Sequence, residues 1–84
     1  MSKYEFSLRQ EVLLEKGADI LAGFFHYSRE NNIPLEDRKN PINVVYALVR
    51  DAKNNILLAS TETELDQIET QFDFARRFYR GIVA

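Results

Sequence analysis

The strongest constraint in this sequence is a regular apolar spacing that starts between Leu8 and Gln10 and continues to about Asn31. Apolar or small residues return every three or four positions in two adjacent rows: Leu13, Gly17, Ile20, Phe24 and Tyr27, and Leu14, Ala18, Leu21 and Phe25. This spacing matches the 3.6-residue turn of an α-helix, so it predicts one long helix. The two rows cover about half of the helix circumference. We expect so wide an apolar face to need a second helix or a partner chain as cover.

The segment 44–59 is interpreted as a β-hairpin. Residues 44–49 read Val-Val-Tyr-Ala-Leu-Val, a β-branched and aromatic run typical of strands. The next residues, Asp-Ala-Lys-Asn-Asn at 51–55, have turn chemistry, and the apolar run Ile-Leu-Leu-Ala follows at 56–59. Both strands are apolar on both faces, which suits a central position in a covered sheet.

Residues 3–9 are predicted to form a first strand. Polar and apolar side chains alternate there, which places Tyr4, Phe6 and Leu8 on one face. A helical alternative stays open, because Ser2 and Glu5 fit the capping box that starts helices.

A second helix is predicted from the Thr61–Glu64 capping box onward. Its core face recurs by threes and fours at Leu65, Ile68, Phe72, Ala75, Tyr79 and Ile82. Its first half is rich in acids and its last turns in arginines, each sign where the helix dipole favours it, and Gly81 is predicted to cap its C-terminal end. The segment 33–41, which holds both prolines, is expected to be an exposed connection.

These elements predict an α+β fold in a single small domain, residues 1–84, with the order β-α-β-β-α. Strand 3–9 and the hairpin would form a three-stranded sheet, with the two helices on one face. The alternative is an α-β-β-α chain that completes its sheet by dimerisation. Both arrangements leave apolar or unpaired strand surface, so we expect a homodimer.

Composition excludes several classes of function. The chain has no cysteine, which removes thiol catalysis and cysteine-ligated metals, and its net charge of −2 offers no general attraction to phosphate backbones. The only histidine, His26, lies on the predicted polar side of the first helix without a partner triad or metal-ligand spacing. The sequence contains neither a secretion signal nor an apolar run long enough to cross a membrane, so we expect a cytoplasmic protein.

Two hypotheses about function remain. The first is a non-enzymatic protein-interaction module without a cofactor, such as an adaptor, a regulatory subunit or a stoichiometric inhibitor carried by a virus or mobile element. Its interface residues would be Gly17, Phe25, Phe74 and Phe78, because two phenylalanines on a helix shoulder and a helical glycine favour close contact. The second is a nucleic-acid or small anionic-ligand binder that uses Arg76, Arg77, Tyr79 and Arg80. We favour the first, because the arginines are also well placed to pair with Asp73 on the same helix.

Overall fold

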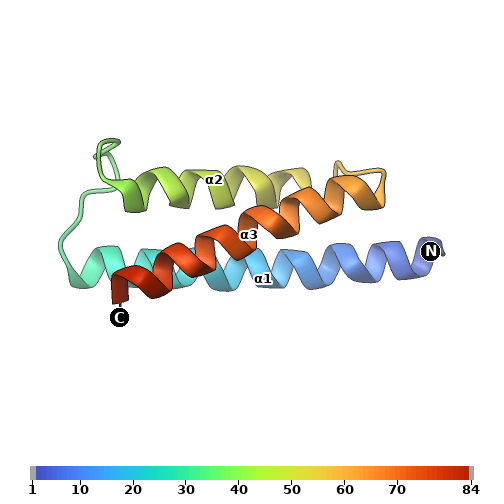
Figure 1. Ribbon diagram of the computed structural model, residues 1–84, viewed down its shortest axis with the longest axis horizontal. Helices are drawn as coiled ribbons and strands as arrows, with labels where there is room; N and C mark the ends of the chain where they lie inside the picture. Colours follow the sequence, from blue (N-terminus) through green and yellow to red (C-terminus); the bar gives the residue numbers. More distant parts are fainter. Residues whose placement is uncertain (1, 84) are drawn as a thin grey trace.

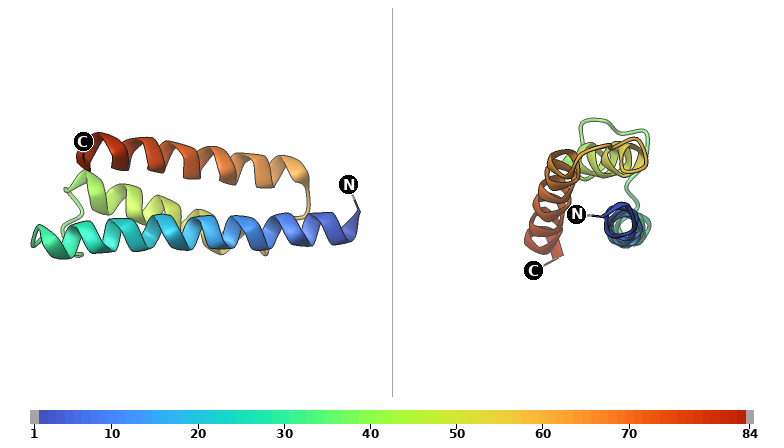
Figure 2. Two further views of the ribbon diagram at one scale, coloured as in Figure 1. Left: turned by 90° about the horizontal axis from the view of Figure 1, so that it is seen from below. Right: turned by 90° about the vertical axis from the view of Figure 1, so that its right-hand side faces the viewer.

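The computed structural model describes residues 2–83, and the part it describes is a bundle of three helices without a strand. The helices are α1 (Lys3–Glu30), α2 (Pro41–Asn55) and α3 (Glu62–Val83). As Figure 1 shows, α1 and α3 run in the same direction, α2 runs the opposite way beside α1, and α3 crosses in front of both. The first turns of α1 extend beyond the ends of both other helices (Figure 2). The predicted α+β fold with a three-stranded sheet is therefore wrong, and so is the ribbon of the α-β-β-α alternative.

Residues 3–9 are the first two turns of α1 and not a strand. Ser2 caps the helix, since its hydroxyl oxygen accepts a hydrogen bond of 3.1 Å from the Glu5 backbone N–H. The capping-box alternative for this segment is confirmed. Alternation over so few residues was a weak guide, because Tyr4 and Leu8 are also neighbours at the i,i+4 spacing of a helix.

The predicted hairpin is also wrong, because residues 41–55 form α2 and 56–58 form a turn. Asn40 caps this helix by accepting a 3.0 Å hydrogen bond from the Ile42 N–H, and Pro41 occupies the first turn, where its missing N–H costs nothing. The buried residues recur at helical spacing: Ile42, Val45, Val49 and Ala52. Burial of this face offsets the modest helix penalty of the β-branched residues.

The core lies where the three helix faces meet. Its largest fully buried side chains come from every helix and from the turn after α2: Phe24, Phe72, Leu13, Ile56, Leu65 and Val49. The predicted core face of α3 is confirmed at Leu65, Ile68, Phe72 and Ala75, with Tyr79 half-buried at its edge. Thus α2 and α3 together cover the row of α1 that holds Leu13, Ile20 and Phe24, whereas Ala18 and Phe25 of the second row stay exposed.

The predicted capping box of α3 is confirmed. Thr61 Oγ1 accepts a 3.2 Å hydrogen bond from the Glu64 N–H, and the Glu64 carboxylate accepts from the Thr61 hydroxyl at 3.0 Å and from the Ser60 N–H at 3.3 Å. These hydrogen bonds lower the pKa of Glu64, and the one from the Thr61 hydroxyl has the largest effect.

Candidate functional site

A row of large exposed apolar side chains lies on the N-terminal part of α1. Tyr4, Leu8 and Val12 follow one another at i,i+4 spacing and are 74%, 51% and 56% exposed. Side chains at this spacing lie on one side of a helix, so the three form a continuous stripe, here called the outer stripe. Part of it lies on the end of α1 that extends past the other helices (Figure 2).

Acidic side chains surround the outer stripe. Glu11, Glu15 and Asp19 lie on the same side of α1 at helical spacing, and all three are exposed. Of the basic residues in this part of the helix, Arg9 and Lys16 are turned toward α3, and Lys3 is exposed in the first turn. Between Tyr4 and Asp19 the outer side of α1 is therefore apolar and acidic.

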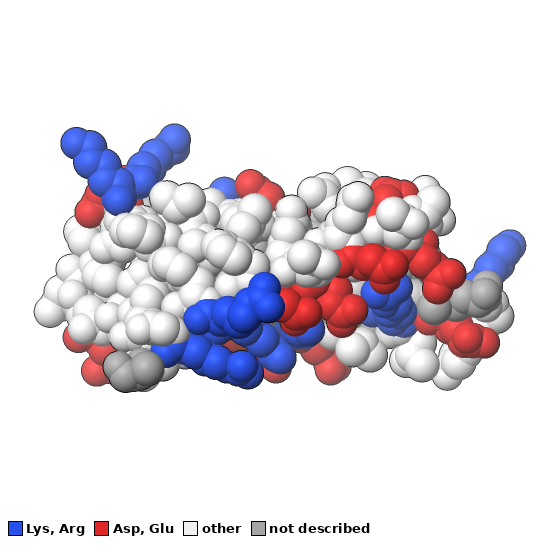
Figure 3. Space-filling model, in the orientation of Figure 1, with Lys and Arg blue, Asp and Glu red and all other residues white. Residues whose placement is uncertain are grey.

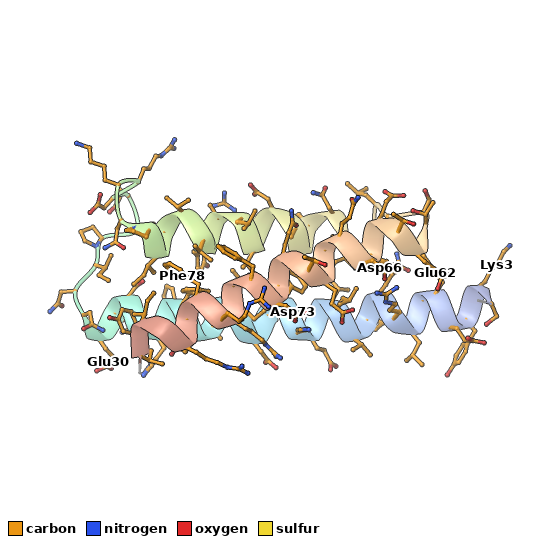
Figure 4. The ribbon with its side chains drawn as sticks, viewed as in Figure 1. Lys3, Glu30, Glu62, Asp66, Asp73 and Phe78 are labelled. Atoms are coloured by element: carbon orange, nitrogen blue, oxygen red, sulfur yellow. The ribbon has the colours of Figure 1, made fainter. Side chains whose placement is uncertain are left out.

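Arg9 and Lys16 join α1 to α3 through a ladder of ion pairs. Arg9 lies 2.6 Å from Asp66 and 3.3 Å from Glu69, and Lys16 lies 3.6 Å from Glu69 and 2.8 Å from Asp73. Figure 4 shows Asp66 and Asp73 on the side of α3 that faces α1. The hydrogen bond from Lys16 lowers the pKa of Asp73, and the one to Asp66 raises the pKa of Arg9.

The three arginines of α3 lie beyond this ladder and form an arginine cluster of Arg76, Arg77 and Arg80, all exposed. No ion pair among residues 2–83 includes any of them. Contrary to the prediction from the sequence, none of the three arginines lies within ion-pair distance of Asp73; Asp73 pairs with Lys16, and the charges of Arg77 and Arg76 act on it only from farther away. In Figure 3 the basic cluster lies next to the acidic first half of α3.

A groove of about 290 Å³ separates the arginine cluster from α1. Asp19 and Gly23 line it on the α1 side, and Arg76, Tyr79 and Arg80 line it on the α3 side. Tyr79 is also part of the aromatic core, since its ring packs edge-on against Phe24 with centroids 5.4 Å apart. It is therefore less available for stacking on a base than the sequence suggested.

The four residues predicted to form a protein interface do not form one patch. Gly17 is buried, and a Cβ added there would lie 2.9 Å from Phe72 Cζ, so this glycine serves packing inside the bundle. Phe25 is 42% exposed on α1, with the Arg29 guanidinium 5.8 Å from its ring centroid. The structure does bring Phe74 and Phe78 together, stacked with centroids 6.5 Å apart, and Phe78 lies on the α2 side of α3 (Figure 4).

Sequence reasoning missed the outer stripe. Its signal was present in the Ser2–Glu5 capping box, which extends the helical spacing back to Tyr4. Among residues 2–83 there is no group of three metal-ligating side chains, and none of the described helices is long and apolar enough to cross a membrane.

The model of a family described as bacterial epsilon antitoxin matches residues 2–82, almost the whole chain. No curated protein and no solved structure matches significantly.

Proposed function

This chain belongs to the bacterial epsilon antitoxin family, and we propose that it is a stoichiometric inhibitor that binds a toxin protein through the outer stripe of α1. The family supports the role of a small protein-binding inhibitor. Such a role needs a complementary surface and no chemistry by the inhibitor itself.

The observation that carries the proposal is the exposure of Tyr4, Leu8 and Val12 at one helical spacing. Large apolar side chains in a row on a helix are the usual contacts of a helix that docks into a groove of its partner. The acids Glu11 and Glu15 border the row and stay solvated in the free protein. The fitting partner therefore has an apolar groove with basic residues along its rim.

The rigid support of the stripe is part of the proposal. The ion pairs of Arg9 and Lys16 fix the side of α1 next to the stripe to α3, so the helix is held in shape before it meets its partner. A preorganised helix loses little conformational entropy on binding, which favours tight inhibition.

The test begins with the toxin itself. Proteins of the source bacterium that the immobilised chain retains are identified, and each is expressed alone to find one that stops growth. Co-expression of the chain should restore growth, and the purified pair should form a complex of defined stoichiometry. If no retained protein is toxic, or if the chain fails to relieve its toxicity, the proposal is wrong.

The surface is tested with a matched pair of variants. Leu8→Asp with Val12→Asp should abolish binding and protection, because it buries two charges in an apolar contact. Leu57→Asp with Leu58→Asp is the control, since these leucines are also exposed, at 66% and 77%, but lie after α2. If both variants protect equally well, the outer stripe is not part of the interface.

A further inference from the structure

We propose that the arginine cluster is a second contact for the same toxin and that it receives an acidic patch of that protein. This inference rests on the proposed function and extends it to the charge pattern of the partner. The outer side of α1 would meet basic residues, and the end of α3 would meet acidic ones. The complex would then have only one favourable orientation.

The two surfaces are continuous. Asp19 lies on the same side of α1 as Leu8 and Val12, and it also lines the groove that Arg76 and Arg80 border. Eleven residues separate Leu8 from Asp19 in the sequence, which corresponds to about 16 Å along a helix. A partner surface of ordinary size, about 800 Å² on each side, can cover that length and the groove together.

The arginine cluster differs from the other basic residues along the contact between α1 and α3. Arg9 and Lys16 each have two carboxylate partners there, whereas Arg76 and Arg80 have no ion pair among residues 2–83. Asp19 is the acid across the groove, and it is not within ion-pair distance of either arginine. The ladder of ion pairs therefore does not continue to Arg76 and Arg80.

The shape of the opening suits a side chain from another protein. Its volume of about 290 Å³ lies between two helices, and Ile20, Gly23 and Val83 contribute apolar lining beside the two arginines. An aspartate or glutamate next to an aliphatic residue would satisfy both the charges and the apolar lining. A carboxylate can accept two parallel hydrogen bonds from one guanidinium, which gives the contact a direction.

The experiment measures association of the toxin recovered above with variants of the full chain at several salt concentrations. We expect Arg76→Glu with Arg80→Glu to lower the association rate constant about tenfold or more at physiological salt, because attraction becomes repulsion. Arg76→Gln with Arg80→Gln should give an intermediate value. The control is Arg38→Glu with Lys39→Glu, which changes the net charge equally in the exposed loop before α2 and should stay within about twofold of the wild type. Circular dichroism verifies that each variant remains helical.

The outcomes separate this inference from the proposed function. If Leu8→Asp with Val12→Asp abolishes binding but Arg76→Glu with Arg80→Glu behaves like its control, only the second contact is wrong. If the chain binds no toxin, both proposals fail. A duplex DNA fragment serves as a further probe. If the wild type binds it, Arg76→Glu with Arg80→Glu does not, and toxin association is unchanged, the cluster is a nucleic-acid surface and this inference is overturned.

Discussion

At the scale of single residues, two glycines of α1 differ in the space around them. A Cβ at Gly17 would lie 2.9 Å from Phe72 Cζ and 3.3 Å from Lys53 Cγ, whereas one at Gly23 would meet Tyr79 at an ordinary 3.7 Å. We expect Gly17→Ala to lower the free energy of unfolding by about 1 kcal/mol, since overpacking exceeds the gain in helix propensity. Gly23→Ala should raise it by up to about 1 kcal/mol. Urea denaturation of both variants measures this difference, and equal effects would show that Phe72 moves aside freely.

Phe72 is the residue on which α3 depends most. It is fully buried and lies against Gly17 of α1, in agreement with its place in the predicted core face. Phe72→Ala should cost about 3 to 5 kcal/mol, a large part of the stability of a small domain. Thermal unfolding followed by circular dichroism measures the loss. A melting temperature within a few degrees of the wild type would contradict the central role of this side chain.

At the scale of elements, the accuracy of sequence interpretation followed the strength of the local signal. The long spacing of α1 and the capping box of α3 predicted both helices, although α1 begins earlier than predicted, at Lys3, and α3 continues past Gly81 to Val83. Residues 44–49 were wrongly predicted as a strand, because their β-branched composition was given more weight than two helix signals. These signals are the Asn40–Pro41 helix start and the helical spacing of Val45, Val49 and Ala52. The candidate site was affected in the same way, since the outer stripe exists only if residues 3–9 are helical. The arginine cluster was identified, but the pairing of Asp73 with Lys16 was not, because Lys16 lies on another helix.

The ladder between α1 and α3 predicts how stability depends on pH. Lys16 lowers the pKa of Asp73 below its ordinary 3.8, so this pair stabilises the fold above about pH 4 and is lost as the pH falls through the lower, folded-state pKa. The Asp73 side chain is 51% exposed, so the contribution is at most about 1 kcal/mol. Lys16→Met should therefore weaken stability at pH 7 and reduce its decline between about pH 4 and pH 2. Urea unfolding across this range tests the prediction, with Lys39→Met in the exposed loop as control. Parallel pH curves for both variants would mean that the ladder does not stabilise the bundle.

At the scale of the whole molecule, the predicted homodimer needs a new basis. It was inferred from hairpin strands with two apolar faces and from an uncovered apolar side of the first helix, yet the strands do not exist and α2 and α3 cover most of that side. What remains is exposed apolar surface, which includes Phe74, a ring that is 47% exposed and stacked on the half-buried Phe78.

We keep the homodimer as a prediction on that narrower ground, because a two-fold contact is the simplest way for identical chains to bury such a surface. Sedimentation equilibrium at micromolar concentration should give twice the chain mass of 9.8 kDa. Phe74→Ser should shift the equilibrium toward monomer with little loss of stability, since this ring is half in solvent. Phe78 is left unchanged because its ring packs near Phe24 in the core, with the two ring centroids 6.2 Å apart. Leu35→Ser, at a residue 54% exposed in the loop before α2, is the control. A wild type that sediments as a monomer throughout would refute self-association, and a dimer indifferent to Phe74→Ser would place the contact on another face of the bundle.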